Sequence, residues 1–179
     1  MVWGFSARWL PVFMGVRPLR NPFLLVALGL NTVGVVLGFL EYLSAAGILL
    51  LVGSATAVAA IPFVEPAVKP AKTVNVHRSF PVFVRIAYGW LLTAAALGIW
   101  AAGVGEAPGI WGASRHALAV GFIAAMIFSV GQRILPSFCG MRVLWSPRLM
   151  LMMLVLLMSG CTPRVASEIL AYQDYAKWA

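Results

Sequence analysis

Long apolar runs constrain this chain more than any other feature of its sequence. A helix needs about 20 predominantly apolar residues to cross the roughly 30 Å hydrocarbon core of a bilayer. Only 10% of the residues are charged, whereas a soluble domain carries about 25% charged residues. Four runs are long enough to span, and they comprise residues 22–40, 44–64, 82–103 and 116–136. The sequence therefore predicts an all-α, polytopic transmembrane helix bundle.

A fifth apolar run is too short to cross the bilayer by itself. It comprises residues 149–158, with the sequence LMLMMLVLLM. To span, its helix must continue through Gly160 and Pro163, and we expect a kinked helix that reaches about Tyr172. The chain then has about five spans, which we expect to form a single membrane domain over residues 1–179.

Basic residues predict the orientation of these spans. The chain has 13 Lys and Arg against 5 Asp and Glu, a net charge of +8. With five spans, one side of the membrane receives Arg8, Arg17, Arg20, Lys69, Lys72, Arg78, Arg142 and Arg148. Because cytoplasmic loops are enriched in Lys and Arg, we expect the N-terminus in the cytoplasm. Basic residues between apolar runs indicate membrane lipid as the partner and no nucleic acid.

A charged decapeptide occurs twice. RWLPVFMGVR at residues 8–17 aligns without a gap with RILPSFCGMR at residues 133–142. Extended to residue 24, the alignment has nine identities in seventeen positions, where about two are expected by chance in so apolar a sequence. Four predicted helices lie between the copies and return the chain to the same side. We therefore expect a partial four-helix parallel repeat, although unrelated cytoplasmic helix ends also share Arg, Pro and Gly.

The repeat predicts how the chain is divided. Residues 1–20 would be the end of a truncated repeat, residues 21–115 its next three helices, and residues 116–179 the start of a second repeat. The helix that should precede the first decapeptide has no counterpart in the sequence. We therefore expect either a piece of a longer protein or a short subunit that another chain completes.

Residues 116–140, HALAVGFIAAMIFSVGQRILPSFCG, resemble the NnrS family. These are polytopic bacterial membrane proteins of the nitric oxide response, which contain haem and copper in about twelve helices. The stretch is also loosely similar to the haem-bearing subunit of haem–copper oxidases, in which a histidine is followed by a glycine and then by a helix ending in L-P-x-F. The resemblance implies a bacterial inner membrane protein that binds haem, and copper as well, and acts in nitric oxide metabolism or nitrosative-stress protection.

His116 is the candidate metal ligand that this resemblance selects. We expect it at the start of the fourth helix, near the outer surface, where its imidazole would be an axial ligand of haem. The simpler interpretation is a helix-end histidine that forms interfacial hydrogen bonds. His77, the only other histidine, lies in a predicted cytoplasmic loop about 30 Å away across the hydrocarbon core. A second haem ligand would therefore come from missing sequence or from another chain.

Other polar residues have structural interpretations. We expect Asn31 and Gln132 to form hydrogen bonds between helices, and Pro136 and Gly140 to end the fourth helix. Arg133 is better explained as a cytoplasmic anchor than as a clamp for a haem propionate, since it lies about 25 Å from His116 along a helix. The methionines of the fifth run could offer thioethers to Cu(I), but packing is their simpler interpretation; they are Met150, Met152, Met153 and Met158. Cys139 in the loop could be a soft ligand or a nitric oxide target, but it has no Cys or His partner near it in the sequence.

Two other function classes stay open. A transporter or channel would fit a parallel repeat of small-residue helices, and its polar path would start at Asn31, Thr32 or Arg164. A non-catalytic scaffold subunit would have only lipid-facing and partner-facing apolar surfaces. The sequence has no phosphate loop, zinc-spaced Cys/His cluster or serine-hydrolase motif, which argues against a hydrolytic enzyme.

Overall fold

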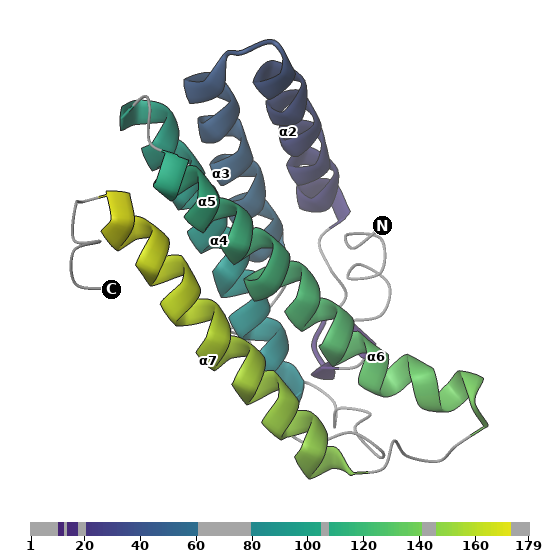
Figure 1. Ribbon diagram of the computed structural model, residues 1–179. Helices are drawn as coiled ribbons and strands as arrows, with labels where there is room; N and C mark the ends of the chain where they lie inside the picture. Colours follow the sequence, from purple (N-terminus) through teal and green to yellow (C-terminus); the bar gives the residue numbers. More distant parts are fainter. Residues whose placement is uncertain are drawn as a thin grey trace. The chain divides into compact units, whose positions relative to one another are not determined.

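The computed structural model describes residues 11–12, 14–17, 21–60, 80–104, 108–140 and 146–172. Every element in these ranges is a helix (Figure 1), and the predicted all-α fold is confirmed. The elements are α2 (Asn21–Phe39), α3 (Leu43–Ala60), α4 (Phe80–Val104), α5 (Pro108–His116), the π-helix η1 (Ala117–Ala124), α6 (Ala125–Phe138) and α7 (Pro147–Tyr172). Within the described residues, five stretches are long and apolar enough to cross a membrane.

The fourth of these stretches begins earlier than the sequence predicted. The helix continues without a break from Pro108 through η1 to Phe138, so His116 lies two turns inside it, and the predicted helix start at His116 is wrong. Proline is favourable in the first turn of a helix because its missing N–H is unpaired there anyway. Ile110 and Ala113 are fully buried, and this burial stabilises the extra turns.

The C-terminal ends of the last two spans agree better with the sequence. The helix of the fourth span ends at Phe138, and Gly140, two residues later, has a φ of +63°, as expected of a glycine that ends a helix. Pro136 does not stop the helix, which continues for two more residues. Helix α7 passes Pro163 and reaches Tyr172, as predicted.

The chain forms two compact units, Met1–Thr73 and Val74–Ala179. In the first, α2 and α3 lie side by side as a hairpin (Figure 1), and small residues bring their backbones together. A Cβ added at Gly34 would lie 3.2 Å from the Ala46 carbonyl oxygen, and one at Gly53 would lie 2.6 Å from the Asn31 amide nitrogen. The two helices therefore approach at positions that tolerate no larger side chain without a shift.

A tight turn joins α2 to α3. Glu41 adopts a φ of +66°, and the Tyr42 N–H donates to the Leu37 carbonyl oxygen at 3.0 Å. This bond is the long one of a Schellman motif, which usually has glycine at the left-handed position. A second Schellman bond joins the Val16 N–H to the Pro11 carbonyl oxygen at 3.0 Å, with Gly15 at φ +70°. Gly15 thus shares the left-handed conformation of Gly140, its partner in the repeated decapeptide.

The polar side chains of α2 bond within their own helix. Asn31 Nδ2 donates to the Ala27 carbonyl oxygen at 2.7 Å, and Thr32 Oγ1 donates to the Leu28 carbonyl oxygen at 2.8 Å. The predicted interhelical hydrogen bond of Asn31 is therefore wrong. The carbonyl four residues earlier is always within reach of a polar side chain in a helix, whereas the facing residue Gly53 has no side chain to bond.

The second unit is built around α4 and the long helix α5–η1–α6. Helix α4 packs along that helix, and α7 packs mainly against α5. Their shared core consists of Ala94, Leu97, Ala101, Ile110, Ala113, Ala117, Cys161 and Val165. Ser114 Oγ donates to the Ala94 carbonyl oxygen at 2.8 Å, which ties α5 to α4. The Tyr88 and Phe122 rings meet edge to face with centroids 5.2 Å apart.

Candidate functional site

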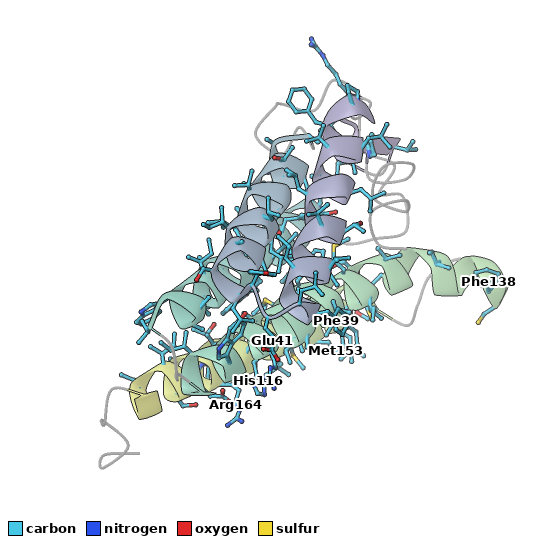
Figure 2. The ribbon with its side chains drawn as sticks, turned by 90° about the horizontal axis from the view of Figure 1, so that it is seen from above. Phe39, Glu41, His116, Phe138, Met153 and Arg164 are labelled. Atoms are coloured by element: carbon cyan, nitrogen blue, oxygen red, sulfur yellow. The ribbon has the colours of Figure 1, made fainter. Side chains whose placement is uncertain are left out.

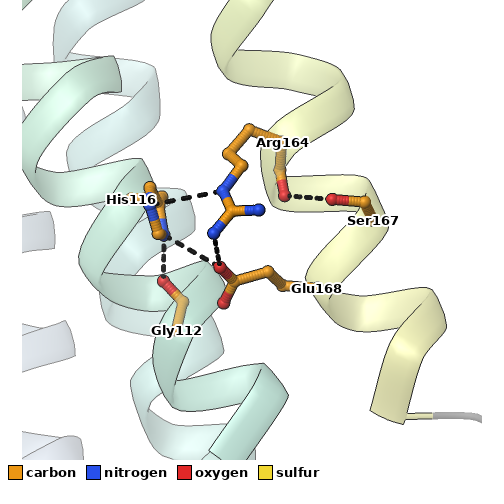
Figure 3. Close-up of polar contacts among 5 residues, drawn as sticks. All are labelled: Gly112, His116, Arg164, Ser167 and Glu168. Carbon is orange, nitrogen blue, oxygen red and sulfur yellow. Dashed lines mark hydrogen bonds and ion pairs between the residues drawn. The ribbon is translucent and has the colours of Figure 1, made fainter.

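A cluster of three ionisable side chains joins α5 to α7. His116 is the last residue of α5, and Arg164 and Glu168 lie one turn apart on α7 (Figure 3). The two α7 residues face the same way because side chains four positions apart share one face of a helix. All three lie within candidate membrane spans, Gly109–Gln132 and Arg148–Leu170. Ionisable groups at such positions are costly and are functional candidates by default.

The contacts of His116 indicate which ring nitrogen carries a hydrogen. Nδ1 lies 2.9 Å from the Gly112 carbonyl oxygen and 3.3 Å from Glu168 Oε1. A carbonyl oxygen only accepts hydrogen bonds, so Nδ1 must carry the hydrogen. In the neutral imidazole the other nitrogen, Nε2, then has an unshared electron pair. In this tautomer, His116 Nε2 can accept a hydrogen bond or bond to a metal ion.

Arg164 links both partners of the pair. Its Nη2 lies 2.8 Å from Glu168 Oε1, and its Nε donates to His116 Nε2 over 3.4 Å, which is long for a hydrogen bond. The Arg164 side chain is 58% exposed, while that of Glu168 is 17% exposed. Glu168 is thus held firmly between two partners, and Arg164 has room to change its rotamer.

Gly112 makes space for the carboxylate. A Cβ added at this position would collide with the Glu168 carboxylate. The glycine therefore serves the cluster twice, through its carbonyl oxygen on His116 and through the absence of a side chain. Gly112 and Glu168 belong to helices that pack directly on one another, and this close approach brings the carboxylate within reach of His116.

A half-enclosed pocket of about 400 Å³ opens beside the cluster. His116 and Arg164 form its polar rim, and Leu156, Leu157, Gly160 and Cys161 of α7 form its wall. Its volume falls in the range of about 300–1,000 Å³ that is typical of ligand sites. Figure 2 shows His116 and Arg164 next to each other at one end of the second unit, with Phe138 at the far end of the long helix.

The π-helix η1 begins immediately after His116. Its wider turns run from Ala117 to Ala124, and Gly121 in its middle lies against Trp90 of α4, where a Cβ would be 2.8 Å from Trp90 Cβ. Short π segments inside α-helices occur frequently at functional sites, because the extra residue turns the side chains on either side relative to one another. Here the segment separates the ion cluster from the rest of the span.

The structure brings together two residues that the sequence analysis singled out, His116 and Arg164, and adds two that it missed. Glu168 was a findable candidate, because it is an acid inside an apolar span and follows Arg164 by four residues. Gly112 gave no such signal, since its role depends on the packing of α5 against α7. Of the other predicted site residues, Cys139 is exposed and unpaired, and His77 lies outside the described residues.

Two further polar side chains are buried in α6. Ser129 Oγ and Gln132 Nε2 have no hydrogen-bond partner within the part of the chain that the structure describes. Ser129 is fully buried and Gln132 is 6% exposed. The predicted interhelical hydrogen bond is therefore not made by the Gln132 amide nitrogen. These groups lie on the same continuous helix as His116.

Metal donors are sparse around His116. Among the described residues, no group of three or more His, Cys, Asp or Glu side chains is placed to hold a metal ion.

Comparison with known families places most of the chain in a described family. Residues 12–179 match a family described as a domain of unknown function, DUF8744. No curated protein and no solved structure matches the chain. The match covers both units, so the hairpin and the helices that carry the ion cluster belong to one family pattern.

Proposed function

This chain belongs to the DUF8744 family, and we propose that it is a haem-binding integral membrane protein of nitric oxide metabolism or nitrosative-stress protection. One observation carries the proposal. His116 Nδ1–H is held by Gly112 and Glu168, which leaves Nε2 as the acceptor of the ring; Nε2 accepts only a long contact from Arg164 Nε, at 3.4 Å, and both side chains line a pocket. The resemblance of residues 116–140 to the NnrS family supplies the expected ligand and chemistry.

The residues around the pocket fit a haem. The macrocycle needs an axial nitrogen, apolar walls and cations near its propionates, and His116, Leu156 with Leu157, and Arg164 match these needs. Arg164 Nε lies 3.4 Å from Nε2, so its side chain must move aside for iron to bond, and its exposure allows this. When bound, haem iron supplies the redox and nitric oxide chemistry. Copper would need donors beyond those of the described residues.

The proposal places the protein in a membrane. Five apolar helices are compatible with a membrane protein, and the excess of Lys and Arg in the predicted cytoplasmic segments supports an N-terminus in the cytoplasm of a bacterial inner membrane. In that orientation the His116 cluster belongs to the outer half of the bilayer. Haem would then be reached from the outer side or from the lipid, where apolar nitric oxide concentrates.

Replacement of the two histidines tests the proposal. The full chain is purified from haem-replete cells, and the Soret absorbance per protein is compared among wild type, His116→Ala and His77→Ala. We expect the band in wild type and His77→Ala and its loss in His116→Ala, because His116 lines the pocket. A folded wild-type protein without a Soret band, or a His116→Ala variant that keeps it, would reject haem binding at this residue.

The buried polar groups of α6 favour a transporter as the second candidate. Among the described residues, Ser129 Oγ and Gln132 Nε2 have no hydrogen-bond partner, and they lie on the same continuous helix as His116, as expected of a polar path through a span. Anion and proton flux into proteoliposomes tests it. Flux that Ser129→Ala lowers, in a protein that binds no haem, would favour transport over the haem proposal.

A further inference from the structure

We infer that Glu168 is the positioning residue that fixes His116 as a haem ligand, with Gly112 as the cradle for its carboxylate. The inference rests on the proposed function, since it assigns a role toward the same group. It goes further in naming the two residues that the sequence pattern and the resemblance leave out.

Glu168 Oε1 is the atom on which the cluster converges. It lies 3.3 Å from His116 Nδ1 and 2.8 Å from Arg164 Nη2. The carboxylate thereby supports the Nδ1–H tautomer, in which Nε2 is the acceptor of the ring. Ligand histidines in metal proteins almost always donate their second N–H to a carboxylate or carbonyl oxygen, and His116 contacts one of each.

The negative charge of Glu168 also offsets the positive charge of Arg164. The Arg164 guanidinium lies beside Nε2, and an unpaired cation there would oppose a metal cation at the same nitrogen. The carboxylate neutralises this cation through its 2.8 Å contact with Arg164 Nη2. Gly112 alone could hold the tautomer through its carbonyl oxygen, but a neutral carbonyl cannot offset the arginine.

The cradle explains why α5 has a glycine one turn before His116. Any side chain at Gly112 would collide with the Glu168 carboxylate. Moving the carboxylate would separate it from Nδ1, since the 3.3 Å contact leaves little slack. Gly112 and Glu168 therefore act together to hold the carboxylate beside His116, although they belong to two helices that are distant in sequence.

The test uses Glu168→Gln with Ser167→Ala as the matched control, because Ser167 Oγ bonds only to the Arg164 carbonyl oxygen of its own helix. Haem is titrated into the haem-free full-length protein, and the midpoint potential of the loaded protein is measured. We expect Glu168→Gln to weaken haem binding about 10- to 100-fold and to raise the potential, because loss of the anion stabilises ferric iron less. Ser167→Ala should match wild type in both.

The outcomes separate this inference from the proposed function. If His116→Ala keeps haem, the proposed function fails. If His116→Ala loses haem while Glu168→Gln keeps wild-type affinity and potential, the inference about Glu168 alone is overturned. A Glu168→Gln protein that folds less well but has an unchanged potential in its loaded fraction would assign Glu168 a merely structural role, and also overturns it.

Discussion

The α2–α3 hairpin and the α4–α7 unit hold apolar helices together by different means. In the hairpin, small residues let the backbones approach, and the polar side chains of α2 bond within their own helix. In the second unit, a hydroxyl joins α5 to α4 and an ion cluster joins α5 to α7. Only 11% of the first span is buried, against 39% of Gly109–Gln132.

This difference shows where chemistry can be placed in an apolar chain. Lipid tails are as apolar as leucine, so apolar surface alone does not drive helices together in a bilayer. In the hairpin, close packing of the backbones holds the two helices together. Its large apolar side chains, such as Phe23, Leu25 and Val26, are exposed. The second unit buries more surface and can therefore hold groups that lipid would not accept. Function is expected in the second unit, and the hairpin is expected to face lipid or other helices.

The largest effect is expected at the contact between η1 and α4. Replacing Gly121 by alanine would place a Cβ 2.8 Å from Trp90 Cβ, an atom that moves only with the backbone. We expect a loss of about 2–3 kcal/mol in the free energy of unfolding, measured in mixed micelles. Gly89→Ala is the matched control, since nothing lies within 4 Å of its Cβ position. Equal stabilities of the two variants would mean that η1 does not pack against α4 this closely.

A smaller effect is expected in the hairpin. Gly53→Ala would place a Cβ 2.6 Å from Asn31 Nδ2 and 3.2 Å from the Asn31 backbone nitrogen. Because the nearer atom ends a side chain that can move, we expect a loss of about 1–2 kcal/mol. Gly29→Ala, which meets nothing within 4 Å, is the control. A tolerated Gly53→Ala would contradict close packing as the source of cohesion in the hairpin.

The smallest effect is expected for the hydrogen bond between α5 and α4. Ser114→Ala removes the donor to the Ala94 carbonyl oxygen, and such bonds in membranes contribute about 0.6 kcal/mol on average. Ser159→Ala is the control, because its hydroxyl bonds to the Leu156 carbonyl oxygen within α7. If both substitutions lower the free energy of unfolding by the same amount, the hydrogen bond between α5 and α4 adds no stability beyond that of a bond within one helix.

The spans themselves could be predicted from the sequence, because crossing a bilayer requires a long apolar run and little else. The start of the fourth span could not. The predicted start at His116 left out the preceding turns, in which the apolar residues Ile110 and Ala113 are fully buried. Hydropathy reflects the free energy of transferring each residue into lipid. It does not show that a charged residue near the end of a span can keep its charged group exposed while the helix continues.

The candidate site was only partly predictable for a different reason. His116 was identified by resemblance, and Arg164 by its charge within a span. Their meeting with Glu168 depends on how α5 and α7 are rotated, which a pattern of apolar residues leaves undefined. The sequence ALAVGFIA has no feature that distinguishes a π-helix from an α-helix. The wider turns of the π-helix nevertheless change which side chains of this helix face the pocket.

Nitrogen NMR of the two histidines tests the central claim most directly. The full chain is labelled with ¹⁵N-histidine in its haem-free form, and His77→Gln assigns the two sets of signals. We predict that His116 carries its hydrogen on Nδ1, that Nε2 is unprotonated, and that added haem shifts the His116 signals while leaving those of His77 in place. A hydrogen on Nε2 of His116, together with signals that haem does not change, would contradict the account.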